Sequence, residues 1–427
     1  MAKSKSQSTV QPGDPVGPKH TKLLEFLSTR GQVEFDAKQV KRGQQLLKQA
    51  RAELLGPLPK DRPVAIFDGW VRRVTLKTRE AAALWPEIAA APALARLEEI
   101  ELLLDDETDA WIEAAARHPL RVTRFHLDAE NVDPDSGEIF DESENSARMV
   151  AAANALSYAT ELVLEFYVDP TSSLAGLDLP QLTSLWIRVM TPGDHEPDAE
   201  VLATLHQAHL PQLRRLAWES STPIDPAAAA AVPAQITELG FWGPSHNAVL
   251  PALVAARPSL TAIGVANRDR DDPEALDDEA LGKLCEGKRL FGPRCNYYKS
   301  FNAGFRILHE LDREADGAAH FAALRGRNSH DADVHFQCGC AIEDDQASAE
   351  AYCEALLVDP DHAPSHNNLG NALVGLGRWR PALYHLQRYL EVEPDFADGW
   401  RNVAKAHRAL GDEEAALAAE AKLPQEA

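Results

Sequence analysis

The sequence is poor in cysteine and in long apolar runs, and each shortage excludes a class of protein. Five of the 427 residues are cysteines, an odd and thinly spread set that predicts free thiols in a reducing compartment rather than a disulfide framework. No apolar run approaches the roughly 20 residues of a membrane helix, and the N-terminal stretch lacks the apolar core of an export signal. These absences favour a cytoplasmic protein without a membrane partner.

Basic charge is also scarce. The chain has 43 basic and 66 acidic residues, which give a net charge of −23. A field of this sign repels phosphate backbones and anionic lipid, so we expect no nucleic-acid partner. The hydrophobic share of 44% is enough for a large core, but the length is too great for one ordinary compact domain unless the fold is a repeat array.

Catalytic motifs are missing as well. The sequence contains no phosphate-binding Gly-rich loop, no G-x-G-x-x-G, no G-x-S-x-G and no H-E-x-x-H, so we expect no cofactor and no enzyme activity. One group of residues has metal-ligand chemistry, and its weak zinc candidates are His335, Cys338 and Cys340, near His330 and Cys353. Cys-x-Cys spacing suits a tetrahedral site poorly, and the favoured interpretation is small buried residues in a helix pair.

A short phrase is repeated along the chain. Leu-Pro-Gln-Leu occurs at residues 179–182 and again at 210–213, each time within an L-x-x-L-x-L pattern that is typical of a short strand. The same pattern recurs eight times, at Val71, Val74, Leu76; Leu97, Ile100, Leu102; Val122, Phe125, Leu127; Ala159, Leu162, Leu164; Leu182, Leu185, Ile187; Leu213, Leu216, Trp218; Ile236, Leu239, Phe241; and Leu260, Ile263, Val265.

The spacing of these eight copies indicates one repeat architecture. They are separated by 26, 25, 37, 23, 31, 23 and 24 residues, mostly within the roughly 20 to 29 residues of a strand, a return helix and two turns. Over about residues 70–268 the sequence resembles the leucine-rich repeat family, which implies an α/β solenoid, or horseshoe, within a domain at 60–268. The Asn or Cys that follows the strand in this family is absent from every copy.

The N-terminal residues have a simpler predicted role. Residues 20–59 carry apolar positions at helical spacing, resemble the leader of some bacterial leucine-rich repeat proteins, and would cover the apolar end of the first repeat as a helical cap. Residues 1–19 are expected to form a disordered tail.

A second period begins near the C-terminus. Gly377 and Gly411 are 34 residues apart, as are the phrases "LVDPDHA" and "EVEPDFA". This is the period of the tetratricopeptide repeat, and residues 333–427 resemble that family, which implies an all-α helical array. The charged and turn-rich residues 269–332 are predicted to be a connector with some helix.

The strand repeats predict a binding surface. Residues between the apolar positions project onto the concave face of a parallel strand stack. Trp186 and Trp242 beside Arg188, Arg214 and Arg215 have the composition of a binding hot spot. The alternative is that inserted loops or the N-terminal helices cover the two rings. The other predicted members of this face are Arg72, Arg73, Glu99, Glu101, His126, Glu165 and Glu219.

The helical repeats predict a second surface. Arg401, Lys405 and Arg408 share one helix face at i, i+4, i+7 spacing, and so do Asn367, Asn371 and Val374 on the preceding helix. In the tetratricopeptide family, Asn and basic residues at such places clamp a terminal carboxylate, and Asn371 and Asn402 match the two Asn places. An acidic or C-terminal carboxylate peptide is therefore the expected ligand. Alternatively, Arg401 and Lys405 neutralise nearby Glu391, Glu393 and Asp398.

Both surfaces favour binding over catalysis. Repeats produce an extended face rather than a pocket, and we expect a non-enzymatic adaptor or scaffold that binds proteins or peptides. The alternative from another class is a hydrolase or metal-dependent enzyme whose site lies in residues 269–340.

Overall fold

The chain divides into two compact units. The computed structural model describes residues 15–29, 35–129, 145–167, 172–190, 198–220, 232–242, 246–265, 277–294 and 297–423. One part, the sheet unit, comprises Pro57–Val64 and Arg72–His320, and the other, the helical unit, comprises Met1–Gly56, Ala65–Val71 and Phe321–Ala427. Among the described residues, no helix has both the length and the apolar character to cross a membrane.

The repeated phrases form one sheet. Ten strands among the described residues lie in strict sequence order, and neighbours from β2 to β10 pair in parallel. Asp68 and Gly69, with φ of 53° and 75°, make the two-residue turn between the first two strands. The strands are β1 (Val64–Phe67), β2 (Trp70–Lys77), β3 (Glu99–Leu103), β4 (Arg124–Ala129), β5 (Glu161–Tyr167), β6 (Ser184–Met190), β7 (Arg215–Ser220), β8 (Glu238–Trp242), β9 (Ala262–Gly264) and β10 (Arg289–Phe291).

The register of the sheet aligns the apolar triplets. Leu162 pairs with Leu185, Leu185 with Leu216 and Leu216 with Leu239, so like positions of successive repeats stack in rows. Every position of the eight triplets is buried. This confirms the predicted strand positions and the burial of their apolar residues. The assignment to the leucine-rich repeat family stays a prediction.

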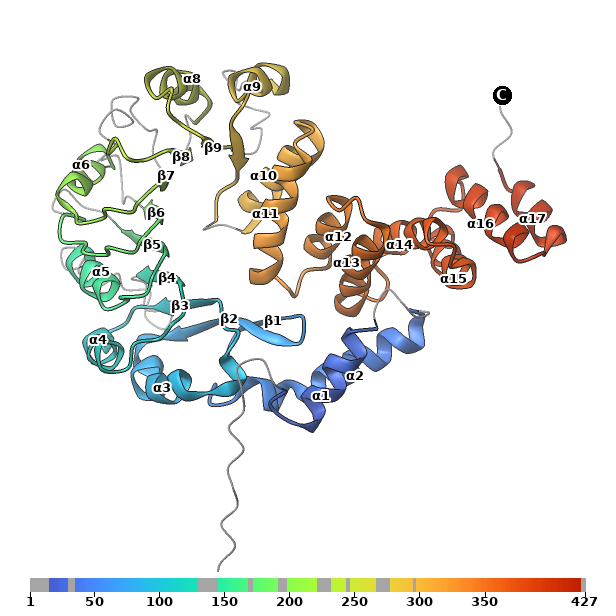
Figure 1. Ribbon diagram of the computed structural model, residues 1–427, viewed down its shortest axis with the longest axis horizontal. Coiled ribbons are helices and arrows are strands. Elements are labelled where there is room, and N and C mark those ends of the chain that lie inside the picture. Colours follow the sequence, from blue (N-terminus) through green and yellow to red (C-terminus); the bar gives the residue numbers. More distant parts are fainter. Residues whose placement is uncertain are drawn as a thin grey trace, which may run out of the picture. The chain divides into compact units, whose positions relative to one another are not determined.

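Helices fill most of the intervals between these strands. Within the sheet unit, the helices from α3 to α8 lie along the outer side of the strand row (Figure 1). They return the chain to the next parallel strand, as the repeat spacing predicts. These helices are α3 (Thr78–Ala90), α4 (Thr108–Arg117), α5 (Asn145–Asn154), α6 (Asp198–Thr204) and α8 (His246–Ala256).

The predicted connector is more ordered than expected. It contains α9 (Asp278–Leu284), the tenth strand, α10 (Tyr297–Phe305), a π-helical turn at Arg306–Glu310 and α11 (Glu314–Arg327). The strand β10 pairs in register with β9. Sequence patterning missed it because only Leu290 occupies an apolar position of the triplet there.

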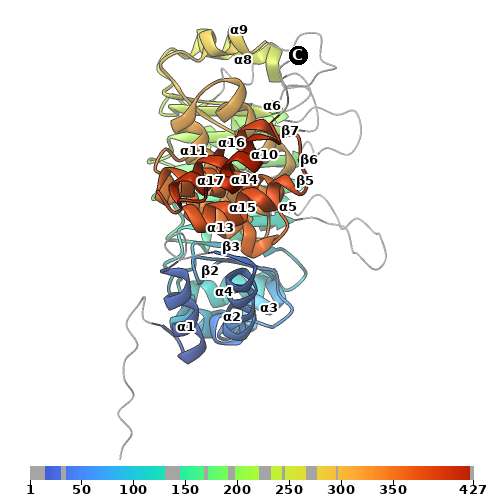
Figure 2. The same ribbon diagram turned by 90° about the vertical axis from the view of Figure 1, so that its right-hand side faces the viewer.

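The helical unit repeats with the predicted period. Its pairs are α12 (Ala332–Cys340) with α13 (Asp345–Val358), α14 (Ala363–Gly375) with α15 (Trp379–Leu390), and α16 (Ala397–Ala409) with α17 (Glu413–Glu420) (Figure 1 and Figure 2, orange to red). The last two pairs begin 34 residues apart. Gly377 and Gly411 stand at equivalent turns with φ of 69° and 80°, a conformation that glycine adopts without a steric cost. The helical array is therefore confirmed.

The N-terminal helices belong to this helical unit. The chain forms α1 (Pro18–Leu27) and α2 (Ala37–Leu55), and Gln44 of α2 donates a hydrogen bond to the carbonyl of Leu357 in α13, 2.9 Å away. Residues 1–14 of the predicted tail lie outside the described residues. The last two residues of that predicted tail, 18 and 19, are helical, because α1 begins at Pro18. The helix pair exists as predicted, and its role as a cap on the first repeat stays a prediction.

Candidate functional site

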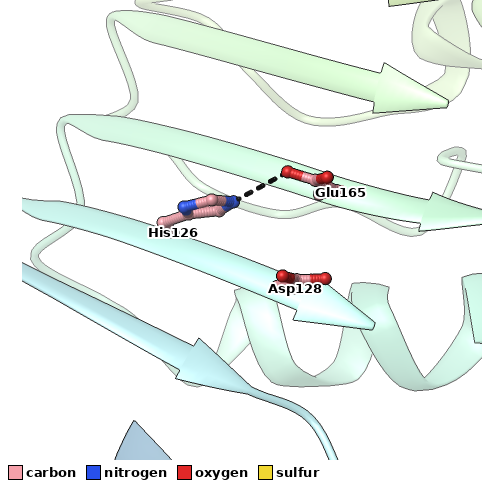
Figure 3. Close-up of side chains that lie close together, drawn as sticks. All are labelled: His126, Asp128 and Glu165. Atoms are coloured by element: carbon pink, nitrogen blue, oxygen red, sulfur yellow. Dashed lines mark ion pairs between the residues drawn. The ribbon is translucent and has the colours of Figure 1, made fainter. Parts of the chain in front are cut away.

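A buried histidine stands at the centre of the charged part of the sheet. His126 of β4 lies between two carboxylates, with Nδ1 3.0 Å from Glu101 Oε1 on β3 and Nε2 3.3 Å from Glu165 Oε2 on β5. Figure 3 shows His126 with Glu165 and Asp128. The side chains of His126 and Glu165 are about 95% buried. We call Glu101, His126 and Glu165, together with Asp128, the histidine cluster.

The two carboxylates keep His126 protonated. Burial favours the neutral ring, but the close carboxylates of Glu101 and Glu165 outweigh this effect and raise the pKa of His126 to about 9. Burial likewise opposes the charged form of Glu101, yet His126 and Arg73 hold the pKa of that carboxyl well below its ordinary value. The cluster is therefore an imidazolium between two carboxylates at neutral pH.

The row of alternating charges extends to both sides of this cluster. Arg73 Nη2 lies 2.7 Å from Glu101 Oε1 on one side, and on the other Arg188 pairs with Glu165. Glu219 follows, with its Oε1 2.7 Å from Nζ of Lys299 in α10. Since each charge has an opposite neighbour, the chain neutralises this part of the face by itself.

The histidine cluster also has the composition of a metal site. His126, Asp128 and Glu165 each place one ligand atom within 4.8 Å of the others. A metal ion would require an unprotonated ring nitrogen and a carboxylate free to ligate. Both ring nitrogens of His126 face carboxylates, and Glu165 already pairs with Arg188. The geometry fits the protonated ion-pair cluster better than a metal ion.

The two predicted hot-spot tryptophans are buried. Trp186 and Trp242 are 2% and 3% exposed and stack with their ring centroids 5.7 Å apart. Phe291 of β10 contacts both rings, and Arg294 lies 5.5 Å from the Trp186 ring centroid. The expected exposure of these rings is wrong, because Phe291 packs against both of them and Arg294 lies over the ring of Trp186. We call Trp186, Trp242 and Phe291 the aromatic cluster.

The arginines predicted for the same face are engaged within the sheet unit. Arg215 pairs with Glu238, and its guanidinium lies 5.0 Å from the Phe291 ring centroid. Arg188 pairs with Glu165, and Arg214 donates to the backbone carbonyls of Pro211 and Leu213. These side chains support the fold, and a role for them in binding a partner stays a prediction.

The predicted helical surface keeps its polar groups at or near the surface. Asn402 Nδ2 donates to Asn371 Oδ1 at 2.8 Å, and Asn367 donates to the neighbouring Asn368. Arg401, Lys405 and Arg408 are all exposed. We call the predicted residues of these two helices, Asn367, Asn371, Arg401, Asn402, Lys405 and Arg408, the α14/α16 set.

The cations of this set differ in their partners. Arg401 pairs with Asp398, one of the carboxylates considered for this role, and Arg408 lies 2.6 Å from Glu420 and 3.3 Å from Glu413. For Lys405 the described residues provide no ion-pair partner. Lys405 is thus the cation of the set that is most available to a ligand.

The weak zinc candidates are occupied by other contacts. His335 is buried, accepts a hydrogen bond at Nδ1 from Arg325 Nε at 3.0 Å, and has Nε2 3.0 Å from the carbonyl of Ser329. The thiols of Cys338 and Cys340 lie 3.8 Å from Arg325 Nη1 and from the hydroxyl of Tyr352. The ring of His335 has no nitrogen left for a metal ion, which supports the interpretation of these residues as packing.

Sequence reasoning placed Glu101, His126 and Glu165 on one face but missed that they form a cluster. The available signal was the charge pattern at one strand position, because Glu165, Arg188 and Glu219 are aligned by the register. The contact of His126 with Glu165 could not be foreseen, since in register His126 pairs with Val163. It depends on a diagonal approach between strands.

Comparisons with known proteins give little further information. No protein-family model matches the chain, and no curated protein matches it. Two crystal structures of MamA are similar to part of it. For the first, the TM-score is 0.29 and the sequence identity 16%, and the match covers 34% of this chain and 83% of the MamA chain. For the second, the TM-score is 0.28 and the identity 17%, and the match covers 30% of this chain and 70% of the MamA chain. These scores are too low to support an argument about fold or function.

Proposed function

We propose that this chain is a non-enzymatic protein-interaction scaffold that binds a peptide at the α14/α16 set and belongs to the leucine-rich repeat class in its sheet unit. The repeated helix pairs and the sequential parallel sheet support this proposal, because both architectures present extended surfaces. The cytoplasm is its proposed location.

The observation that carries the proposal is Lys405 beside the Asn371 and Asn402 pair. The bond between the two amides uses Asn402 Nδ2 and Asn371 Oδ1, which leaves the Nδ2 group of Asn371 as a donor. A carboxylate accepts well from an ammonium and an amide together. The ligand class is therefore an acidic peptide or a C-terminal carboxylate.

A fluorescent peptide with a free C-terminal carboxylate, compared with its amidated form, tests this assignment. The free-acid peptide should bind the full chain more tightly, and binding should weaken as salt rises because exposed charges are screened. Asn371→Ala with Lys405→Glu should weaken binding about tenfold or more, a loss of roughly 1.4 kcal/mol or more.

The matched control is Lys422→Glu, which makes the same charge change at another exposed lysine of the helical unit. Equal affinity of the free-acid and amidated peptides, or an equal loss in the control variant, would show that the α14/α16 set does not bind a terminal carboxylate.

A further inference from the structure

The helix α2 is basic within an acidic chain. Its sequence AKQVKRGQQLLKQARAELL contains five basic residues and one acidic residue, while the whole chain carries −23. Lys38, Lys41 and Lys48 recur at i, i+3 and i+10, which places them on one side of the helix. All three are exposed, and none has an ion-pair partner among the described residues. We call these three residues the basic stripe.

The two carboxylates at the start and near the end of α2 are used elsewhere. Asp36 caps the helix by accepting from the backbone amide of Gln39 at 2.9 Å. Glu53, the acidic residue of α2, accepts from the backbone amides of Lys19 and His20 at 3.0 and 2.9 Å. Neither carboxylate forms an ion pair with the stripe.

The helix that carries this stripe packs closely against the rest of the helical unit. Val40, Ala50 and Leu54 are buried on its opposite side. Gly43 allows a close approach, because a Cβ there would stand 2.4 Å from Leu357 of α13. The backbone that carries the stripe is therefore held in place by packing before any partner arrives, which reduces the entropy cost of binding.

A cleft opens beside the stripe within the helical unit. Its volume is about 520 Å³, within the range of roughly 300 to 1,000 Å³ that is usual for ligand sites. The lining residues are Val40, Lys41, Gln44, Pro360, Asp361, His366, Tyr384 and Arg388.

The cleft offers donors for a carboxylate. Lys41 brings an ammonium group and Tyr384 a hydroxyl, which has no hydrogen-bond partner in the described part of the chain. Arg388 also lines the cleft, but its guanidinium lies 2.9 Å from the carboxylate of Asp361, which already balances its charge. Burial lowers the pKa of His366, so its ring is neutral.

We propose that the basic stripe and this cleft bind an acidic segment of a partner protein, with one Asp or Glu side chain entering the cleft at Lys41 and Tyr384. Charge complementarity carries this assignment, since the stripe is a cationic surface that the described chain leaves unneutralised. A short acidic peptide fits better than nucleic acid, because an extended polyanion would also meet the repulsion of the surrounding negative field. The site is separate from the α14/α16 set and does not depend on it.

Fluorescence anisotropy on the full chain tests the proposal. The probe is a labelled peptide of eight Glu residues, acetylated and amidated so that it has no terminal charge. The comparison peptide has Gln in place of every Glu. The Glu peptide should bind and should weaken steeply with salt, and the Gln peptide should not bind. Lys41→Glu with Lys48→Glu should reduce affinity at least tenfold, and Tyr384→Phe about threefold to tenfold.

Matched variants separate binding at this site from a general effect of net charge. Lys283→Glu with Lys422→Glu makes the same change in net charge at two exposed lysines outside the stripe, and it should leave binding within about twofold. Asn371→Ala with Lys405→Glu should also leave it intact, which separates this site from the one proposed above.

Three results would overturn the proposal. The first is unchanged binding in the stripe variant, and the second is an equal loss in the matched control. The third is tighter binding of a single-stranded oligonucleotide of the same charge than of the Glu peptide.

Discussion

The two units differ in their unpaired charges, although several arginines of the helical unit also form ion pairs. In the sheet unit, the row from Arg73 to Lys299 buries charged groups and neutralises each of them with another residue of the same unit. In the helical unit, Lys41 and Lys405 are exposed and lack an ion-pair partner among the described residues. A charged residue therefore points to a partner only where its own chain leaves it unneutralised.

The histidines show the same contrast. His126 is buried as a cation because carboxylates surround it. His366 and His385 are buried as a pair with their Nδ1 atoms 2.8 Å apart. Burial lowers the pKa of both rings, and the neighbouring His366 adds to this effect at His385. Burial thus accompanies a protonated histidine in the sheet unit and neutral histidines in the helical unit.

The largest expected effect concerns the aromatic cluster. Trp242→Ala should lower the free energy of unfolding by about 3 to 5 kcal/mol, as much as Trp218→Ala, because both rings are buried. Denaturant unfolding of both variants measures this loss. Trp400→Ala in the helical unit should cost less, since that ring is only partly buried. A near-normal midpoint for Trp242→Ala would restore the exposed-hot-spot hypothesis.

The next effect is an opposite pH dependence of the two units. The raised pKa of His126 adds stability that is complete below about pH 6.5 and is lost as pH rises through about 9. The lowered pKa of His385 means that the unfolded chain binds more protons, so the helical unit loses stability as pH falls below about 6.5. Hydrogen-exchange protection of β4 and of α15, measured from pH 5 to pH 9, should therefore move in opposite directions.

His126→Gln supplies the control. Without the imidazolium, the buried carboxylates of Glu101 and Glu165 each lose an opposite charge, and the free energy of unfolding should fall by about 3 to 5 kcal/mol. The alkaline loss of protection should also disappear from β4. His118→Gln, at an exposed histidine of the same unit, should do neither. An alkaline loss that persists in His126→Gln would assign it to another group.

The smallest effect compares two glycines. Gly377→Ala should destabilise the helical unit by about 1 kcal/mol, because its φ of 69° is strained for any residue with a Cβ. Gly282→Ala in α9 of the sheet unit meets open space and should stabilise by roughly 0.5 to 1 kcal/mol. Thermal unfolding should show a lower midpoint for Gly377→Ala and a higher midpoint for Gly282→Ala. A lower midpoint for Gly282→Ala would contradict the helical assignment there.

The repeats made much of the fold predictable. Apolar residues at fixed spacing identified eight strands, because burial of those positions depends on local periodicity. The 34-residue offset likewise identified the helix pairs, since their turns require Gly377 and Gly411. The association of α2 with α13 could not be foreseen, because it joins segments more than 300 residues apart, as in the bond from Gln44 to Leu357 (separation 313).

The candidate sites were less predictable than the fold. Trp186 and Trp242 have the composition of a hot spot, and their burial depends on Phe291 and Arg294 from a segment predicted to be a connector. The availability of a charge follows from which side chains reach it, as Lys299 reaches Glu219. Periodicity gives the face of a residue, but not what later covers that face.

The late position of α10 in the chain has a consequence for synthesis on the ribosome. The strands pair with neighbours that emerge shortly before them, whereas Glu219 meets Lys299 across 80 residues and Glu161 meets Arg294 across 133. At about 5 to 20 residues per second, Glu219 emerges roughly 4 to 16 s before Lys299. During that interval the nascent sheet lacks the Phe291 and Arg294 side chains that contact its tryptophans, so this apolar surface is exposed at the stage when the chain is most prone to aggregate.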